Sequence, residues 1–321
     1  SLKAVSESLC ETSLRGVDSH GIKLLPHYVR SAISGRKNPN PNFKIFSNYP
    51  SIISIDADNA FGHAAGMKAV EVGTDIAKKL GVCVVAVKNS SHPGAMACMT
   101  LEGARKGYIS IGFSHADALM LSHSGTRPFF GTNPISIAAP RLENHPYCLD
   151  MATSMISWNK LLNHRKEKLT LESGLAANKN GDSTTDPDEA NSLFPAGSYK
   201  GFGLASMVEI FCGIYNGMEY GRNIPPMYTT PIELKRKLGQ FYIFLKSDGA
   251  IEESQFLSSM QNLTDEVRNE PAKEGKKVKL PNDPEIESEE IRRKEGIPVD
   301  EEFCENINEL LKKFQLKNVY F

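Results

Sequence analysis

Residues 82–113 read VCVVAVKNSSHPGAMACMTLEGARKGYISIGF, and this stretch decides the fold class. Val82–Val87 is an unbroken apolar run, which predicts a buried strand. A polar loop with a proline and a glycine follows it. The pattern then becomes helical over Ala95–Lys106 and returns to a strand over Tyr108–Phe113. A strand that leads through a polar loop into a helix places reactive side chains at the carboxyl end of a sheet. The stretch therefore predicts an α/β fold.

The alternation of strands and helices continues on both sides of this stretch. We expect helices at residues 1–14, 24–35, 63–80, 200–217, 253–268, 287–295 and 300–315, and strands at 51–56, 135–139, 147–149 and 240–245. Asp150 or Thr153 is expected to cap a further helix that ends near residue 166. Residues 38–50, 114–134, 178–187 and 269–279 are predicted to be loops.

Composition places the chain among ordinary globular proteins. It has 321 residues, 40% hydrophobic and 23% charged, which is enough for two domains or one large domain. The formal net charge of −1 provides no field that would attract nucleic acid or an anionic membrane. No apolar run has the ~20 residues of a membrane helix, and the first residues lack a signal-peptide pattern. None of the six cysteines forms a CxxC pair, which argues against a zinc site and favours a reducing, cytoplasmic setting.

A polar cluster near the amino end combines Arg15, Asp18, Ser19 and His20, and Tyr28 follows on the next helix. Glycines at 16 and 21 let a ligand approach the backbone closely. An imidazole has an unperturbed pKa of ~6.5, so His20 on such a loop can exchange a proton with a small substrate. The alternative is a surface loop that merely follows a helix.

Three further polar clusters interrupt apolar segments: Asn89–Gly94 with His92, Gly131–Pro134, and the pair formed by Leu149–Ser154 and Ser198–Gly203. His92 could instead be a capping residue. Lys200 at a helix amino terminus indicates an anionic partner, because the helix dipole disfavours a cation there.

No GxGxxG follows any predicted strand, which argues against a standard Rossmann site. The chain also lacks HxH, HxxxH and GxSxG patterns, which makes a metal hydrolase or a serine hydrolase a poor alternative.

Taken together, these clusters resemble the type-2 malate/L-lactate dehydrogenases, which include ureidoglycolate and sulfolactate dehydrogenases and a cyclic-imine reductase. The matching motifs are RGVDSHG (15–21), NSSHPG (89–94), GTNPISIAAP (131–140), LDMATS (149–154), NGDSTTDP (180–187), YKGFGLASMVE (199–209) and LPNDPE (280–285). The resemblance implies a mixed α/β fold with a largely antiparallel central sheet and a non-Rossmann nicotinamide site. It also implies a homodimer and hydride transfer between NAD(P)H and a small 2-oxo acid.

The resemblance also assigns roles to residues. His20 would be the catalytic acid/base and His92 a second imidazole facing the substrate, and which of them transfers the proton stays open. Ser19 and Tyr28 would lie in the substrate site. The cofactor would contact Thr132, Asn133, Asp150, Met151, Ala152 and Lys200, and the segment Pro281–Pro284, which includes Asn282 and Asp283, would close over it.

The chain departs from the family pattern at the carboxylate-binding cation. The family commonly has arginine four residues after the first histidine, where this chain has Leu24. We expect Lys23 or Arg15 to bind the substrate carboxylate instead, because a 2-oxo acid needs a cation. Asn282 stands where glycine is usual, and residues 163–172 are also less typical.

The sequence thus predicts an NAD- or NADP-dependent 2-hydroxy-acid dehydrogenase, with malate and oxaloacetate as the first substrates to expect. The alternatives are a lactate, ureidoglycolate or cyclic-imine enzyme of the same family, or an inactive relative that only binds nucleotide. Residues 1–50 with 279–321 would form a helical substrate and dimerisation part. Residues 51–278 would form the cofactor-binding part.

Overall fold

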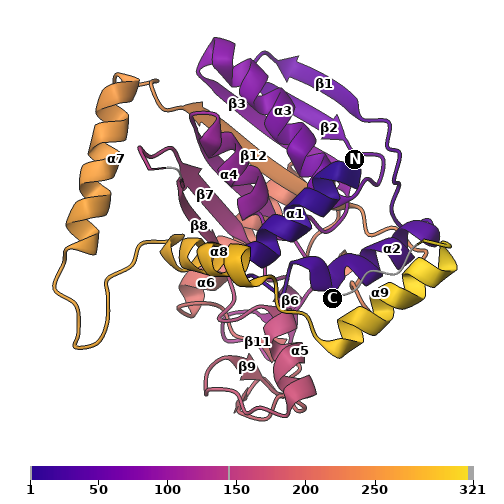
Figure 1. Cartoon of the computed structure of the whole chain (residues 1–321). Helices are drawn as coiled ribbons and strands as arrows, with labels where there is room; N and C mark the ends of the chain where they lie inside the picture. The colour runs from indigo at the N-terminus through magenta and orange to yellow at the C-terminus, as the bar shows by residue number, and fades with distance from the viewer. Residues whose placement is uncertain (1, 144, 317–321) are drawn as a thin grey trace.

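The computed structural model describes residues 2–143 and 145–316 of the chain (Figure 1). Its centre is a seven-stranded sheet in the order β1-β2-β3-β12-β4-β7-β8. These strands are β1 (Lys44–Tyr49), β2 (Ile52–Asp56), β3 (Val82–Ser90), β4 (Tyr108–Ser114), β7 (Ile135–Ala139), β8 (Tyr147–Met151) and β12 (Leu238–Lys246). Only β2 and β3 pair in parallel, and every other neighbouring pair in this sheet is antiparallel. The expected mixed, largely antiparallel α/β fold is confirmed.

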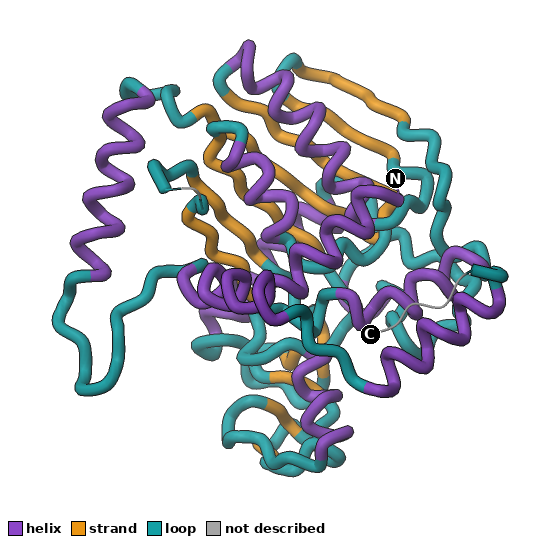
Figure 2. The backbone as a smooth tube through the Cα atoms, in the orientation of Figure 1, coloured by secondary structure: helices purple, strands orange, loops and turns teal. Residues whose placement is uncertain are grey.

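Helices cover both faces of this sheet, as Figures 1 and 2 show. α3 (Gly62–Leu80) and α4 (Ala97–Arg105) lie on one face, and α6 (Tyr199–Glu209) with the π-helix η2 (Ile210–Ile214) packs on the other. Alternation along β3 explains why both faces are apolar, because successive side chains of a strand point to opposite faces. Val85 and Val87 join the core under α3, whereas Val84 and Ala86 pack with η2.

Helices from both ends of the chain lie together beside one end of the sheet (Figure 1). They are α1 (Leu2–Leu14), η1 (Ile22–Leu24), α2 (Leu25–Ile33), α8 (Asp283–Glu295) and α9 (Glu301–Lys313). α1 packs against both α3 and α8, and α2 packs against α9. A small core of Leu9 and Tyr28 with Phe61 joins these helices to the sheet part of the molecule.

A second, five-stranded sheet has the order β10-β9-β11-β5-β6. Its strands are β5 (Met120–Leu121), β6 (Pro128–Phe130), β9 (Ala176–Ala177), β10 (Ser183–Thr184) and β11 (Ser192–Leu193), and they lie near α5 (Trp158–Glu167). The short helix η3 (Gly221–Asn223) packs against β6. α7 (Glu253–Arg268) stands apart at one side of the molecule and reaches α8 through a long loop (Figure 2).

Five features differ from the sequence expectations. Residues 38–50 are not all loop, because β1 forms an exposed edge strand paired to β2. Neither Asp150 nor Thr153 caps α5: Asp150 belongs to β8, and α5 begins after Ser157, whose Oγ accepts a hydrogen bond from the Lys160 N–H. The helix from residue 200 changes to π geometry at Ile210, and α8 begins at Asp283 rather than at residue 287. Loops expected at 114–134 and 178–187 contain the two-to-three-residue strands β5, β6 and β10.

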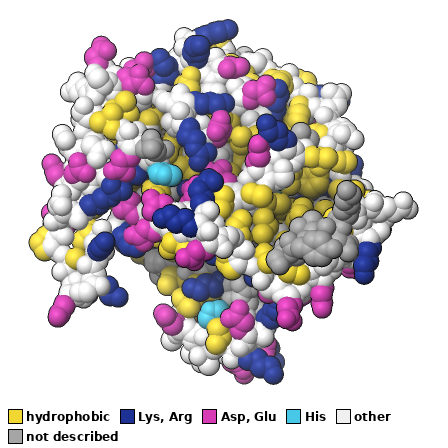
Figure 3. All heavy atoms as spheres, in the orientation of Figure 1, with side chains coloured by type: hydrophobic (Ala, Val, Ile, Leu, Met, Phe, Trp, Pro, Cys, Tyr) yellow, Lys and Arg dark blue, Asp and Glu magenta, His cyan; other side chains and the backbone are white. Residues whose placement is uncertain are grey.

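No helix in residues 2–143 and 145–316 is long and apolar enough to cross a membrane. On the face seen in Figure 3, Lys and Arg side chains are interspersed with Asp and Glu. This mixture agrees with the near-zero formal charge of the chain.

Candidate active site

Three adjoining cavities lie between the carboxyl end of β3 and the start of α8. The outer cavity, of about 370 Å³, is lined by Thr12, Arg15, Val17, Ala95, Ala97, Cys98, Cys148, Leu149, Asp150, Lys279, Leu280, Pro281, Asn282, Pro284 and Glu285. The middle cavity, of about 400 Å³, shares Val17, Ala95 and Asp150 with it and adds Ser19, His20, Gly94, Met96, Thr132, Pro134, Met151, Ala152, Ser154, Met155, Ile156, Ser157 and Ala196. The inner cavity, of about 70 Å³, shares His20, Thr132 and Ser157 with the middle one. The shared residues make the three cavities neighbours in one cleft.

The inner cavity contains both imidazoles expected from the sequence. Its remaining lining residues are His92, Ala116, Asp117, Leu119, Trp158, Asn159, Met227, Tyr228 and Arg236. The ring centroids of His20 and His92 are 5.5 Å apart. Two loops separated by about 70 residues in sequence therefore place their histidines in the lining of the same small cavity.

Each imidazole is held through its Nδ1 atom. The Ser19 hydroxyl lies 2.8 Å from Nδ1 of His20, and the Tyr28 hydroxyl lies 2.7 Å from Nδ1 of His92. Such a contact fixes the orientation of a ring and leaves its Nε2 for another partner. Tyr28 is buried and does not line any of the three cavities, so it acts on His92 from behind.

Burial keeps both imidazoles neutral near pH 7. Desolvation lowers the pKa of His20 to about 4. Desolvation also lowers the pKa of His92 well below its ordinary value, and the neighbouring His20, Lys37 and Arg236 lower it further. Lys37 contributes because a charged ammonium disfavours a second positive charge on the imidazole. Its Nζ is buried 3.6 Å from the centroid of the Tyr28 ring, and this burial lowers the pKa of Lys37 well below its usual range.

The loop that carries His92 needs glycine at position 94. Gly94 has φ +73°, and a Cβ atom there would lie 2.4 Å from Nε2 of the buried His63. A side chain would therefore be strained by the backbone and would also collide with an imidazole. The loop that carries His20 is held differently, because Arg292 of α8 forms two hydrogen bonds with the Asp18 carboxylate, at 2.6 and 2.8 Å.

Asp150 lies where the outer and middle cavities meet. One carboxylate oxygen accepts a hydrogen bond from the Ala97 N–H at 2.8 Å. Burial raises the pKa of Asp150 to about 6, and the Ala97 N–H and the charge of Arg15 oppose that rise. Met151, Ala152 and Thr132 continue the wall of the middle cavity. Arg15 is buried in the wall of the outer cavity, away from the two imidazoles.

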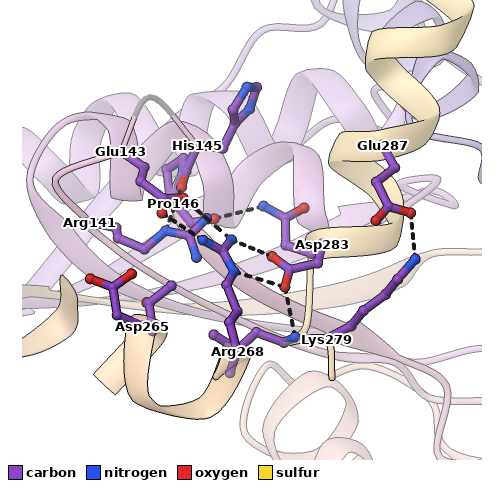
Figure 4. A network of polar contacts seen from close by, with 12 residues as sticks. Arg141, Glu143, His145, Pro146, Asp265, Arg268, Lys279, Asp283 and Glu287 are labelled. Carbon is purple, nitrogen blue, oxygen red and sulfur yellow. Dashed lines mark hydrogen bonds and ion pairs between the residues drawn. The ribbon is translucent and has the colours of Figure 1, made fainter. Parts of the chain in front are cut away.

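Charged side chains from three elements hold the segment Pro281–Asp283 over the outer cavity (Figure 4). Arg268 of α7 donates to both carboxylate oxygens of Asp283 and also to Glu143. Asn282 has φ +83°, which asparagine tolerates better than most residues, so its presence in place of glycine is compatible with this turn. Its Nδ2 donates to the Pro146 carbonyl at 2.7 Å.

Five residues expected in the site lie outside the lining of the three cavities: Tyr28, described above, and Lys23, Asn133, Lys200 and Asp283. Lys23 is exposed and paired with Asp300 at 3.1 Å. Asn133 is fully buried and donates to the Ala205 carbonyl and to Glu209, which anchors the Thr132 turn to α6. Lys200 is exposed on the first turn of α6, and Asp283 is held by Arg268.

The sequence interpretation missed several residues of the inner cavity, among them Asp117, Asn159 and Arg236. Asp117 follows β4 closely, so the rule that drew attention to the residues after β3 could have found it. Arg236 lies in a charged segment, and nothing in that pattern distinguishes it from the exposed lysines beside it. Its place in the cavity depends on tertiary packing alone.

Comparison with known proteins gives one consistent result. The model of the Malate/L-lactate dehydrogenase family matches residues 2–308. The malate dehydrogenase of Pyrococcus abyssi is 30% identical over 99% of this chain and 89% of its own length. The ureidoglycolate dehydrogenase (NAD(+)) of Escherichia coli is 32% identical over 75% of this chain and 69% of its own length.

A solved structure of similar architecture agrees with these sequence matches. The crystal structure of malate dehydrogenase from Entamoeba histolytica superposes with a TM-score of 0.93 at 26% identity, covering 99% of this chain and 92% of that one. The residues matched by the family model, 2–308, include both the loop of His20 and the segment over the outer cavity. The chain belongs to the malate/L-lactate dehydrogenase family, whose members are oxidoreductases that act on hydroxy acids.

Proposed function

We propose that this protein transfers a hydride between a nicotinamide dinucleotide, NAD or NADP, and the keto carbon of a small 2-oxo acid. Oxaloacetate and malate are the first substrates to test, since two relatives named malate dehydrogenase match nearly the whole chain. The observation that carries the proposal is the pair of imidazoles, 5.5 Å apart, on a cavity that adjoins two larger ones.

The two histidines suit the proton step of such a reaction. Reduction of a keto group produces an alkoxide, which must gain a proton as the hydride arrives. With Nδ1 of each ring engaged by Tyr28 or Ser19, Nε2 is the atom that can hold a proton for the substrate oxygen. A positioned imidazole of this kind contributes roughly 10²–10⁴-fold to a rate. We propose His20 as the acid/base and His92 as the second imidazole that contacts the substrate.

The outer and middle cavities fit a dinucleotide. Each lies within the ~300–1,000 Å³ typical of ligand sites, and the small side chains Ala95 and Ala152 leave room against the backbone. Arg15 and Asp150 offer a cation and a hydrogen-bond acceptor for the polar parts of the ligand. When bound, the nicotinamide ring supplies or accepts the hydride, and the protein orients it and excludes water.

The remaining cofactor contacts stay proposals from the family motifs. Thr132, Met151 and Ala152 would contact the nicotinamide end, because all three line the middle cavity. Pro281 and Asn282 would close over the other end, and Asp283 would fix them through Arg268. Asn133 would act by positioning Thr132. Lys200 would bind a phosphate at the exposed amino terminus of α6.

We also propose a homodimer and a cytoplasmic location. Leu204, Met207, Ile210 and Ile214 form an apolar stripe along α6 and η2, and each of these side chains is at least 43% exposed. Such a stripe is typical of a surface that another chain covers. In the proposed domain division, residues 1–50 and 279–321 form the substrate part and 51–278 the cofactor part. The outermost residues of these ranges, 1 and 317–321, and residue 144 lie outside the described residues.

The test is the consumption of NADH and NADPH in the presence of oxaloacetate and pyruvate. Turnover with either acid would support the proposal, and a cyclic imine and ureidoglycolate distinguish the alternatives within the family. Binding of NADH without turnover of any 2-oxo acid or imine would instead favour an inactive nucleotide-binding relative. NADH binding is measured alongside turnover because this chain has Leu24 where the family commonly has arginine.

A further inference from the structure

The inner cavity is lined by a single arginine and no lysine in the described part of the chain. Its volume of about 70 Å³ is far smaller than the 370 and 400 Å³ of the outer and middle cavities. It therefore has room for a small group such as a carboxylate, and not for a nucleotide. The arginine is Arg236, which directly precedes the turn into β12 and lines the same space as His20 and His92.

Two of the three guanidinium nitrogens of Arg236 are already fixed. Nε donates to the Pro225 carbonyl at 2.7 Å, and Nη2 is bonded and ion-paired to Asp117. Nη1 donates to no group among the described residues. The side chain is only 4% exposed, so the cation is held rigidly where solvent competes weakly. A rigid guanidinium with one free nitrogen is suited to bind an anion at a fixed position.

The cations expected from the sequence are not available for this task. Arg15 lines the outer cavity and neither of the two cavities that His20 and His92 line. Lys23 lies on the protein surface with Asp300, and position 24 is a buried leucine. We propose that Arg236 binds the carboxylate of the 2-oxo acid and so places its keto carbon between the imidazoles and the middle cavity. This inference rests on the proposed function for its substrate class.

The charges around the cavity favour an anionic guest. Asp117 is the only carboxylate that lines it in the described residues, and its charge is already paired with Arg236. The Nη1 atom of Arg236 remains without a partner among the described residues. A substrate carboxylate would accept a charge-assisted hydrogen bond from this atom. Because such a bond is stronger than one to a neutral carbonyl oxygen, the cavity favours an acid over a neutral ketone of the same size.

The experiment compares Arg236→Gln and Arg236→Lys with wild type, using pyruvate and its uncharged ester methyl pyruvate as substrates. Removing a hydrogen bond to a charged group lowers affinity about 10- to 100-fold. We expect Arg236→Gln to raise the KM for pyruvate by that factor and to change the KM for methyl pyruvate less than threefold. Arg236→Lys should recover part of the loss. Equal effects on acid and ester would mean a merely structural role and would overturn the inference.

Binding of oxamate, which carries a carboxylate but cannot be reduced, separates this inference from the proposed function. Calorimetric titration into the NADH complex should show binding to wild type and a loss of about 10-fold or more in Arg236→Gln. Oxamate binding that depends on Arg236, without turnover, would uphold the carboxylate site and reject hydride transfer. Failure of oxamate to bind wild type would overturn the carboxylate site, whatever the activity.

Two controls guard against misfolding. Arg30→Gln removes the same charge from a surface arginine that pairs with Glu309, and it should leave every constant unchanged. Asp117→Asn combined with Arg236→Gln removes the buried pair together, so that no uncompensated carboxylate remains. If Arg236→Gln alone fails to fold, the double variant should still show the selective loss for pyruvate. An unchanged ratio of acid to ester in the double variant would overturn the inference.

Discussion

At the scale of single residues, His20 and His92 are each held through Nδ1, but by hydroxyl groups of different origin. Ser19 is the neighbour of His20 in sequence, whereas Tyr28 reaches His92 from α2. The family motifs identified these four residues, and the structure brings them together. What the sequence could not provide was the position of Arg236, because its cavity is built from segments far apart in the chain.

His20→Ala should lower kcat by at least ~10²-fold and change the dissociation constant for NADH less than twofold, because the proposed mechanism assigns this imidazole to the proton step and not to cofactor binding. Steady-state kinetics and NADH fluorescence measure the two quantities. His164→Ala, on the surface-facing helix α5, is the matched control. An unaltered kcat would remove His20 from the proton step and leave His92→Ala as the next variant.

The pH profile should differ between the two directions of the reaction. Reduction needs a protonated imidazole, and the pKa of His20 is about 4 in the absence of substrate. His63, His92, Lys37 and Arg236 lie near this imidazole. Two carboxylates line a cavity with it: Asp117 is paired with Arg236, and Asp150 accepts the Ala97 N–H. The protonated fraction therefore falls about tenfold per pH unit above the pKa. We expect kcat/KM for oxo-acid reduction to decline between pH 5 and 8.

The reverse reaction needs the neutral imidazole. Burial raises the pKa of Asp150 in the same cleft to about 6, so kcat/KM for hydroxy-acid oxidation should be nearly constant from pH 7 to 8, where both groups are deprotonated. Both profiles are measured with saturating cofactor at constant ionic strength. A reduction profile that stays level up to pH 7 would contradict the low pKa of the free site.

At the scale of elements, α7 acts on the outer cavity although it lines no part of it. Arg268, at its carboxyl end, joins Glu143 to Asp283 at the start of α8 (Figure 4). We expect Arg268→Ala to raise the KM for NADH about 3- to 10-fold, since partly exposed ion pairs contribute up to roughly 1 kcal/mol each. The value of kcat should change less than twofold.

Arg293→Ala is the control for this prediction, because Arg293 lies on α8 with its side chain 62% exposed and pairs only with Glu289 among the described residues. An effect of Arg268→Ala on kcat with an unchanged KM for NADH would show that the contacts of Arg268 with Glu143 and Asp283 do not support cofactor binding.

Most elements could be predicted from the sequence, because apolar periodicity is strong in α3, β3 and β12. The errors have physical causes. β1 has no buried face, so its sequence lacks the alternation that marks a strand. Asp150 resembles a helix cap, but its carboxylate accepts the Ala97 N–H at the start of another helix. The π-helix at Ile210–Ile214 has no simple sequence signature.

At the scale of the whole molecule, the apolar stripe of α6 and η2 decides the expected oligomeric state. Light scattering coupled to size-exclusion chromatography should give wild type twice the 35.3 kDa of one chain. Met207→Lys places a charge in the middle of the stripe, where the side chain is 46% exposed, and should shift the protein toward the single-chain mass.

Leu263→Lys adds the same charge at an equally exposed leucine of α7 and should leave the dimer intact. A single-chain mass for wild type at micromolar concentration would reject the dimer.

The contact between Arg292 and Asp18 links the first functional loop of the chain to one of its last helices. During synthesis on the ribosome, His20 emerges some 270 residues before the side chain that holds its loop in place. A nascent chain can fold its sheet early and yet remain without a formed substrate pocket. The loop of His20 therefore lacks this ion pair until α8 has been synthesised.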